Sequence, residues 1–331
     1  MSLSPPLLFL HLVADRKLNP GAVLLGFAEG DTDLLLPQVM HEDFSALTAA
    51  LPCLIKAEEE SRLSAGLRQN LQDAGCQWLP EDSLHDSDEQ TKPAPPPPVT
   101  WISGDWYLAP PAKPVGNQVV SRALALKLVQ LVAADADTRE IEDIFRRDPV
   151  LAYHLLRLVN SPGIGMSKRI TSFSQAILVL GRQQLKRWLN LMLFAASKED
   201  HRSAMLLARV GVRARSMELL AREAGLDKQK QELAFMTGMF SLLGILFGLP
   251  LADILKPLQL DESLPGALLR QEGELGCLLQ MAVSAEHSDA PALHELLGKA
   301  QVTALSFNQI NIEAHRWILD ILRDKQGAAN A

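Results

Sequence analysis

Apolar residues recur along the chain in two different patterns, and the pattern changes near residue 112. Before that point, LLFLHLVADRKLNPGAVLLGF places two short apolar runs around a polar turn at residues 19–21, the arrangement expected of a strand hairpin. DTDLLLP is expected to add a third strand, and residues 44–51 and 58–74 carry helical spacing. The first part of the sequence therefore predicts a small α/β domain over residues 1–112.

From residue 119 onward the apolar spacing is helical almost throughout. Ser172 and Asp289 occupy expected N-cap positions, Pro149 suits a first helical turn and Gly225 suits a helix end. Residues 113–331 are therefore expected to form an all-α domain, which makes the whole chain α+β. Helices are expected near 119–134, 138–145, 149–160, 171–179, 181–197, 202–225, 229–247, 250–257, 261–269, 274–286, 289–297 and 301–322.

A polar, proline-rich segment interrupts the first domain. Residues 81–98 read EDSLHDSDEQTKPAPPPP, an acidic half followed by a proline run, and predict a mobile loop. Aromatic and apolar residues return in WISGDWYLAPP at 101–111, so the domain is not expected to end at the loop. The proline and glycine of AKPVGNQ at 112–118 favour a boundary there instead.

Length and composition indicate a folded protein of two modest domains. The chain has 331 residues, of which 47% are apolar and 21% charged, as in ordinary globular proteins and unlike disordered chains. Cys53, Cys76 and Cys277 are an odd number without C-x-x-C spacing, so they suggest neither a disulfide framework nor a cysteine zinc site. Residues 1–12 lack the features of a secretory signal, and a cytoplasmic location is expected.

One segment is long and apolar enough to be weighed as a membrane span. Residues 233–252 contain no formal charge. Polar Thr237 and Ser241, three glycines and Pro250 interrupt the segment, and it has no aromatic belt at its ends. A helix of this kind is typical of the centre of a bundle, so no membrane span is expected.

The charge is divided unevenly between the two parts. Residues 1–112 contain six Lys/Arg and sixteen Asp/Glu, whereas the remainder contains twenty-six and twenty-three. This division argues against a whole-protein nucleic-acid binder. The basic stretch 186–222 is a candidate docking face for an acidic partner or an anion, or simply a solvated helix side. It could also meet the acidic first domain in an autoinhibitory contact that salt would weaken. The docking candidates are Arg187, Arg202, Arg209, Arg213 and Arg215.

Residues 141–188 closely resemble the N-terminal half of HDOD domains, which are helical relatives of the HD phosphohydrolases. Asp-Pro, Leu-Leu-Arg, Asn-Ser, Ile-Thr-Ser, Gln-Ala and Leu-Gly groups occur in the order and spacing of that family. Each group also has a structural interpretation, since Asn-Ser can end a helix, serine can cap the next one and glycine lets helices pack closely. We interpret as structural the signature residues Asp148, Pro149, Asn160, Ser161, Ser172 and Gly181.

The resemblance also bears on catalysis. An active HD phosphohydrolase carries a His-Asp pair in a segment of the form Gly-Leu-Leu-His-Asp-Ile-Gly, and residues 238–244 read GMFSLLG here, with Ser241 and Leu242 in place of the pair. Arg209, with a shift of one turn left open, and Glu272 fall at the positions of two further histidines. Because leucine offers no lone pair and arginine repels a cation, the resemblance implies no catalytic residue, metal or cofactor.

The sequence of residues 238–289 is similar to one branch of the family, the EAL-HDOD proteins, which implies a vestigial EAL domain in front. HLVADRKLNPGAVLLGF resembles the opening strands of an EAL domain, with Leu24 at the position of the metal-binding glutamate. GDWYLAP at 104–110 resembles the signature that closes the EAL barrel. About 110 residues are half of what an eight-stranded α/β barrel needs, so the domain would be shortened and degenerate. An unrelated small α/β domain is the alternative.

Together these features predict a non-catalytic signal-transduction protein, not an enzyme, that acts as an interaction scaffold through its HDOD domain. The family implies partners such as a kinase, a diguanylate cyclase or a motility regulator, in cyclic di-GMP-related or two-component signalling. Cyclic di-GMP binding without hydrolysis stays open. The alternative is a divergent metal-dependent phosphohydrolase or a cyclic di-GMP-binding sensor. Nucleic-acid binding is not expected, because no stacking aromatics lie among the arginines.

Overall fold

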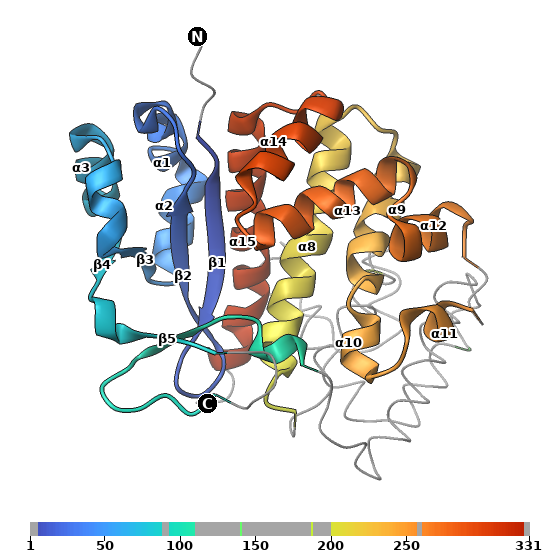
Figure 1. Ribbon diagram of the computed structural model, residues 1–331, viewed down its shortest axis with the longest axis horizontal. Coiled ribbons are helices and arrows are strands. Elements are labelled where there is room, and N and C mark those ends of the chain that lie inside the picture. Colours follow the sequence, from blue (N-terminus) through green and yellow to red (C-terminus); the bar gives the residue numbers. More distant parts are fainter. Residues whose placement is uncertain are drawn as a thin grey trace.

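A computed structural model describes the chain over residues 6–87, 93–109, 140, 187, 200–256 and 260–327, with side chains up to residue 322 except at residue 81. Over these residues the N-terminal part contains a six-stranded sheet, and the C-terminal part forms a layer of helices beside it (Figure 1). The predicted order, an α/β part followed by a helical part, is confirmed there. Apart from residues 140 and 187, the helices predicted between 119 and 197 lie outside the described residues.

The sheet has the strand order β4-β3-β2-β1-β6-β5. The predicted hairpin is confirmed, since β1 (Leu8–Ala14) and β2 (Pro20–Phe27) are antiparallel, and Leu18 takes a left-handed φ of 64° in the turn. On one side of the hairpin β3 (Cys53–Lys56) and β4 (Gln77–Leu79) add in parallel. On the other side lie β6 (Trp101–Ser103), antiparallel to β1, and β5 (Leu84–Asp86), parallel to β6.

The prediction of a third strand at DTDLLLP is wrong. This segment forms the 3₁₀ helix η1 (Thr32–Leu35) and the one-turn helix α1 (Leu36–Val39). Asp31 starts the turn because its side chain accepts a hydrogen bond from the Asp33 N–H, and a proline lies in the first turn of α1. Local capping therefore outweighs the short apolar run.

The helix predicted over 44–51 is confirmed as α2 (Glu42–Ala50), but the helix predicted over 58–74 is divided. It consists of the 3₁₀ helix η2 (Ala57–Arg62) and the α-helix α3 (Ala65–Asp73). Ser64 separates them, because its hydroxyl accepts a hydrogen bond from the Leu67 N–H and so acts as the N-cap of α3.

The segment predicted as a mobile loop, 81–98, contains regular structure at its start. The 3₁₀ helix η3 (Glu81–Ser83) leads into β5. Further along, the guanidinium of Arg16 donates hydrogen bonds to the backbone carbonyls of Pro95 and Val99, which holds the proline run against the hairpin turn. After β6 comes the 3₁₀ helix η4 (Trp106–Leu108), whose Trp106 and Tyr107 are buried.

The described helices of the C-terminal part follow the predicted ranges with one exception. The helix predicted over 229–247 is interrupted at Ser241-Leu242. Gly225 ends α8 with a φ of 74°, and Asp289 caps α14 by accepting from the Ala292 N–H, as predicted. No helix in the described residues is long and apolar enough to span a membrane. The helices are α8 (Ser203–Glu223), α9 (Lys228–Phe240), α10 (Leu243–Phe247), α11 (Leu251–Leu255), α12 (Ser263–Arg270), α13 (Gly273–Glu286), α14 (Ala290–Lys299) and α15 (Ala304–Gly327).

One hydrophobic core runs through both parts of the chain. It includes buried residues of β1, β2, α2 and α3 together with those of α8, α9, α13 and α15. Helix α15 lies along β1 (Figure 1), and two of its asparagines bind the backbone at the start of that strand. Asn308 accepts from the Leu8 N–H and donates to the Pro6 carbonyl, while Asn311 donates to the Leu8 carbonyl. The last helix therefore completes the N-terminal part.

Candidate functional site

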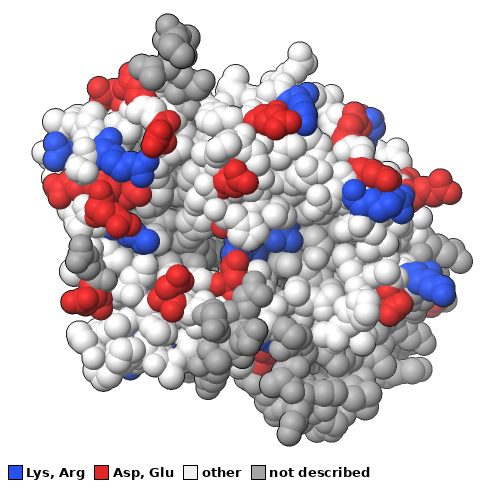
Figure 2. Space-filling model, in the orientation of Figure 1, with Lys and Arg blue, Asp and Glu red and all other residues white. Residues whose placement is uncertain are grey.

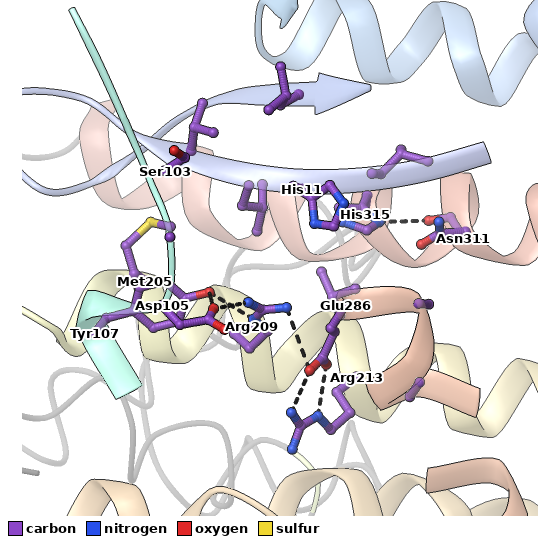
Figure 3. A pocket seen from close by; sticks show the side chains of 18 of the residues that line it. His11, Ser103, Asp105, Tyr107, Met205, Arg209, Arg213, Glu286, Asn311 and His315 are labelled. Atoms are coloured by element: carbon purple, nitrogen blue, oxygen red, sulfur yellow. Dashed lines mark hydrogen bonds and ion pairs between the residues drawn. The ribbon is translucent and has the colours of Figure 1, made fainter. Parts of the chain in front are cut away.

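A cavity of about 280 Å³ lies where the sheet meets the helical layer. Strand β1 forms one side of it, and α8, α13 and α15 form the others, together with the segment after β6 (Figure 3). The surface is hollowed in this region, with basic and acidic side chains close together at the bottom of the hollow (Figure 2). The polar side chains that line the cavity include those of His11, Asp105, Arg209, Glu286, Asn311 and His315.

Arg209 of α8 joins the helical layer to the segment after β6. Its Nε donates to Tyr107 Oη at 2.7 Å, and its Nη2 donates to Asp105 Oδ1 at 2.5 Å. Burial works against the charged guanidinium, but Tyr107, Glu286 and Asp105 outweigh it and raise the pKa of Arg209. Burial also raises the pKa of Tyr107 to about 12, so its hydroxyl stays protonated at neutral pH.

Glu286 at the end of α13 lies between two arginines. Arg213 donates to both of its carboxylate oxygens, at 2.8 and 2.5 Å, and Arg209 Nη1 lies 3.5 Å from Oε2. Burial alone would raise the pKa of Glu286, but the charges of Arg213 and Arg209 outweigh it and lower the pKa. The carboxylate is therefore ionised at neutral pH.

Arg213 also reaches the interruption between α9 and α10. Its Nη1 donates to Ser241 Oγ at 2.8 Å, and the Ser241 hydroxyl donates in turn to the Gly238 carbonyl at 2.6 Å. Hydrogen bonds and the Arg209–Glu286 ion pair together thus connect the N-terminal part to the end of α9. We call this set the arginine cluster: Asp105, Tyr107, Arg209, Arg213, Ser241 and Glu286.

The structure brings together two of the four residues that the sequence resemblance predicts at former HD ligand positions. Arg209 and Ser241 both belong to the arginine cluster. The arginine that contacts Ser241 is Arg213, which lies one helical turn after Arg209. Leu242 is buried in the core, 4% exposed. Glu272 lies at the exposed start of α13, where it pairs with Arg270.

The side chains of the arginine cluster do not suit a divalent cation. Two guanidinium groups lie around the Glu286 carboxylate: Arg213 donates hydrogen bonds to both of its oxygens, and Arg209 forms an ion pair with it. A metal ion would have to displace buried, paired charges, which costs several kcal/mol per ion. Among the described residues, no group of three His, Cys, Asp or Glu side chains lies close enough together to hold a metal.

Two neutral histidines face the cavity. His315 of α15 is 3% exposed, and its Nδ1 donates to the Asn311 carbonyl at 2.8 Å; burial nevertheless lowers the pKa of His315 to about 4. His11 of β1 lies opposite Leu24, and its Nε2 is 2.8 Å from Ser288 Oγ. Burial, and then the charge of Arg209, lowers the pKa of His11 to about 4. Leu24, at the expected position of the EAL glutamate, also lines the cavity.

The five arginines predicted as a docking face do not form an open basic surface. A buried guanidinium needs an acidic or carbonyl partner, and each of these side chains has one inside the protein. Arg209 and Arg213 belong to the arginine cluster, and Arg202 is buried against Asp200. The other two are paired as Arg187 with Glu218 and Glu232, and Arg215 with Glu218 and Glu313.

Comparison with known proteins identifies the class of the helical part. Residues 121–253 match the model of the HDOD domain, so the chain contains an HDOD domain. Helices α8 and α9, which carry Arg209, Arg213 and Gly238, lie within this match. The signature residues Asp148, Pro149, Asn160, Ser161, Ser172 and Gly181 fall inside the matched range but outside the described residues.

Two curated proteins are similar to this chain over part of their length. One is the cyclic di-GMP phosphodiesterase CdgJ of Vibrio cholerae, 30% identical over 203 residues, which are 60% of this chain and 46% of that protein. The other is the uncharacterized protein YuxH of Bacillus subtilis, 28% identical over 172 residues, 51% of this chain and 41% of that protein. The chain therefore spans less than half of the length of these relatives.

Two solved structures are distantly similar. A putative phosphohydrolase from Shewanella amazonensis has a TM-score of 0.45 and 17% identity, covering 61% of this chain and 93% of its own. An HDOD domain protein of unknown function from Geobacter sulfurreducens has a TM-score of 0.36 and 16% identity, covering 56% and 85%.

The sequence pattern alone did not identify several residues of the site. Glu286 is an ordinary acidic residue at the end of a helical pattern, and only the packing of α13 against α8 brings it to the arginines. Asp105 and Tyr107 lie in the motif GDWYLAP, but the motif does not predict their hydrogen bonds with Arg209. His315 has no sequence signal that separates it from other helical histidines.

Proposed function

We propose that this chain is a non-catalytic signal-transduction protein that binds its partners through its HDOD domain. The observation that carries the proposal is the arginine cluster. Arg209 and Ser241 fall at former HD ligand positions, and Arg213 and Glu286 occupy the space between them with paired charges. A network of this kind stabilises the contact between elements, and among the described residues no cluster of His and carboxylate side chains is placed to hold a metal that would activate water. A fold kept without its reactive groups is suited to binding.

The printed name of one curated relative supports a particular signalling pathway for this protein. That relative is named a cyclic di-GMP phosphodiesterase, which supports a role in cyclic di-GMP-related signalling. A kinase, a diguanylate cyclase or a motility regulator would then be a suitable partner, in the cytoplasm and without nucleic acid. We also propose that the N-terminal part is a shortened, degenerate EAL-like domain, supported by the β1–β2 hairpin and by Leu24 at the glutamate position.

The proposal is tested by incubating the purified protein with cyclic di-GMP in the presence of Mg²⁺ or Mn²⁺ and analysing the products by chromatography. The expected result is intact cyclic di-GMP. Appearance of a linear or monomeric product that the Glu286→Gln variant no longer forms would contradict the proposal. The matched control is Glu295→Gln, because Glu295 is exposed on α14 and pairs only with Lys299.

The second candidate is a cyclic di-GMP sensor or phosphodiesterase. It is favoured by the printed name of the CdgJ relative. Isothermal titration with cyclic di-GMP separates the candidates when combined with the product assay. Binding without product supports a sensor, binding with product supports an enzyme, and the absence of binding supports a scaffold that acts through protein contacts.

A further inference from the structure

The cavity beside the arginine cluster has the dimensions of a small-molecule site. Its volume of about 280 Å³ is close to the lower end of the range of about 300 to 1,000 Å³ found for ligand pockets. Its walls come from β1, β2, β5 and the segment after β6 on one side and from α8, α13 and α15 on the other. A site of this size suits a molecule of about the size of a nucleoside.

His315 presents an unused hydrogen-bond acceptor to this cavity. A backbone carbonyl can only accept, so the contact with the Asn311 carbonyl requires the ring hydrogen of His315 to be on Nδ1. Nε2 is then an acceptor, and it has no hydrogen-bond partner among the residues that the structure describes. The residue is 97% buried and lines the cavity (Figure 3). Nε2 is not among the fully enclosed side-chain atoms that lack a hydrogen-bond partner, so it is open to the cavity, where a donor on a ligand can take the place of water.

The remaining lining indicates an uncharged ligand with flat apolar faces. Three basic and three acidic side chains line the cavity, so it has no excess charge to attract a strongly ionic molecule. The walls between them are largely apolar. A molecule that combines apolar faces with N–H groups on its edge is a heteroaromatic ring. The charged residues are Lys56, Arg209, Arg213, Asp86, Asp105 and Glu286, and the apolar walls include Leu24, Leu84, Val212, Ala282 and Phe307.

We infer that this cavity binds an uncharged heterocycle of nucleoside size, such as a purine nucleoside, whose ring N–H or exocyclic amino group donates to His315 Nε2. The apolar walls would contact the faces of the ring. Because the lining comes from both parts of the chain, the bound ring would also hold the sheet against the helices. This inference is independent of the proposed function, since it requires neither hydrolysis nor a protein partner.

The test is isothermal titration of the full-length protein with adenosine and with guanosine, each up to its solubility limit. Two variants address the cavity. His315→Phe keeps a ring of similar size but removes the acceptor, and Ala285→Phe places a bulky side chain at the cavity wall formed by α13. His294→Gln is the matched control, because His294 lies on α14 away from the cavity. Thermal unfolding of each variant verifies that it is folded.

The inference predicts that at least one nucleoside binds the wild-type protein and the His294→Gln variant equally well. Loss of one hydrogen bond should weaken binding about tenfold in His315→Phe, and Ala285→Phe should abolish it. Failure of both nucleosides to bind, or binding that neither cavity variant changes, would overturn the inference. Binding of cyclic di-GMP but of neither nucleoside would also overturn it, while supporting the sensor function. Hydrolysis of cyclic di-GMP would contradict the scaffold proposal alone.

Discussion

Glu286 holds the arginine cluster together at the scale of single residues. Its carboxylate is the shared partner of Arg209 and Arg213, and its side chain is 11% exposed. Buried ion pairs contribute little when they are compared with apolar residues of the same shape. Removing one partner is different, because it leaves an uncompensated charge in the interior. The cluster therefore makes the contact between α8 and α13 sensitive to single substitutions.

Glu286→Gln should lower the free energy of unfolding by about 3 to 5 kcal/mol, because it leaves two buried guanidiniums with one fewer counter-charge. Urea unfolding followed by circular dichroism measures the change. The double variant Arg213→Met/Glu286→Leu should recover much of the loss, since it removes both members of the closest pair. The exposed pair variant Glu295→Gln should have little effect. An equally small effect of Glu286→Gln would show that the cluster is not structural.

The neutral histidines predict how stability depends on pH. His315 has a folded pKa of about 4, below its ordinary value near 6.5, so the unfolded chain takes up a proton in this interval and the folded protein does not. The free energy of unfolding should therefore fall as the pH drops from about 6.5 towards 4, at about 1.4 kcal/mol per pH unit for each such histidine. His11, Arg209 and Glu286 are the charged or titratable groups around His315.

Urea unfolding at several pH values between 4 and 6.5 measures this slope. In His315→Phe the slope of the free energy of unfolding against pH should correspond to the uptake of about one proton fewer on unfolding. His294→Gln should keep the wild-type slope. Protonation of Glu286 also lowers the free energy of unfolding. Because the pKa of Glu286 is lowered in the folded protein, that effect begins only below the ordinary pKa of about 4.5. A slope unchanged by His315→Phe would contradict a neutral, buried His315.

The sequence identified some of these residues and missed others for a physical reason. Ser241 and Leu242 could be selected because they lie in the short segment GMFSLLG, whereas Arg209 was selected from a helical pattern that left a shift of one turn open. For the downstream position the alignment pointed to Glu272 at the start of α13, while the residue that meets the arginines is Glu286 at the end of the same helix. Which end of a helix approaches a neighbour depends on packing between distant segments, and local patterns do not contain that information.

Helices α8 and α9 make a close contact through a glycine. A Cβ on Gly238 would lie 2.5 Å from the Cα of Ala214, which no real side chain tolerates without movement of the backbone. The same glycine provides the carbonyl that accepts from Ser241. Gly238 therefore both allows the close approach of α8 and α9 and binds Ser241.

Gly238→Ala should be destabilising by about 1 to 3 kcal/mol, because the added methyl group forces α8 and α9 apart. Gly298→Ala in α14 is the matched control, since its Cβ would meet no atom within 4 Å. That substitution should be neutral or stabilising by up to about 1 kcal/mol, through the higher helix propensity of alanine. Thermal and urea unfolding compare the two. Equal effects at both positions would contradict the close contact.

The longer elements were more predictable than the short ones. The hairpin and the helices from α8 to α15 follow apolar periodicity and capping residues, and their ranges were largely correct. Strands β3, β4, β5 and β6 have only three or four residues each. A run of that length has no reliable period of its own, and pairing with neighbouring strands decides whether it becomes a strand. For the same reason η1 was mistaken for a strand.

At the scale of the whole molecule, the two predicted domains share one core. The boundary predicted at residue 112 rests on composition, and it falls outside the described residues. Helix α15 packs along β1 and α2, so the core joins segments that lie about 300 residues apart in the chain. Asn308 is fully buried, and both its carbonyl and its amide group bind the start of the sheet. The contact consists largely of apolar packing and of buried hydrogen bonds between uncharged groups, so salt should weaken it little.

A chain consisting of residues 113–331 should therefore be poorly soluble or should bind a hydrophobic dye, because it exposes the surfaces of α8, α13 and α15 that β1 covers. Co-expression with residues 1–112 should restore a soluble complex that persists at high salt. Dye fluorescence and size-exclusion chromatography measure both effects. A soluble, dye-free 113–331 fragment would contradict the shared core, and dissociation of the complex by salt alone would support the autoinhibitory contact instead.

The most direct test of the central claim is whether the arginine cluster excludes a metal ion. Titration of the metal-free protein with Mn²⁺, followed by electron paramagnetic resonance of the free ion, measures binding without any assay of activity. The account predicts no stoichiometric uptake by the wild-type protein, because paired guanidiniums surround the Glu286 carboxylate. Uptake of one or two Mn²⁺ per chain that Glu286→Gln reduces and Glu295→Gln does not would contradict it.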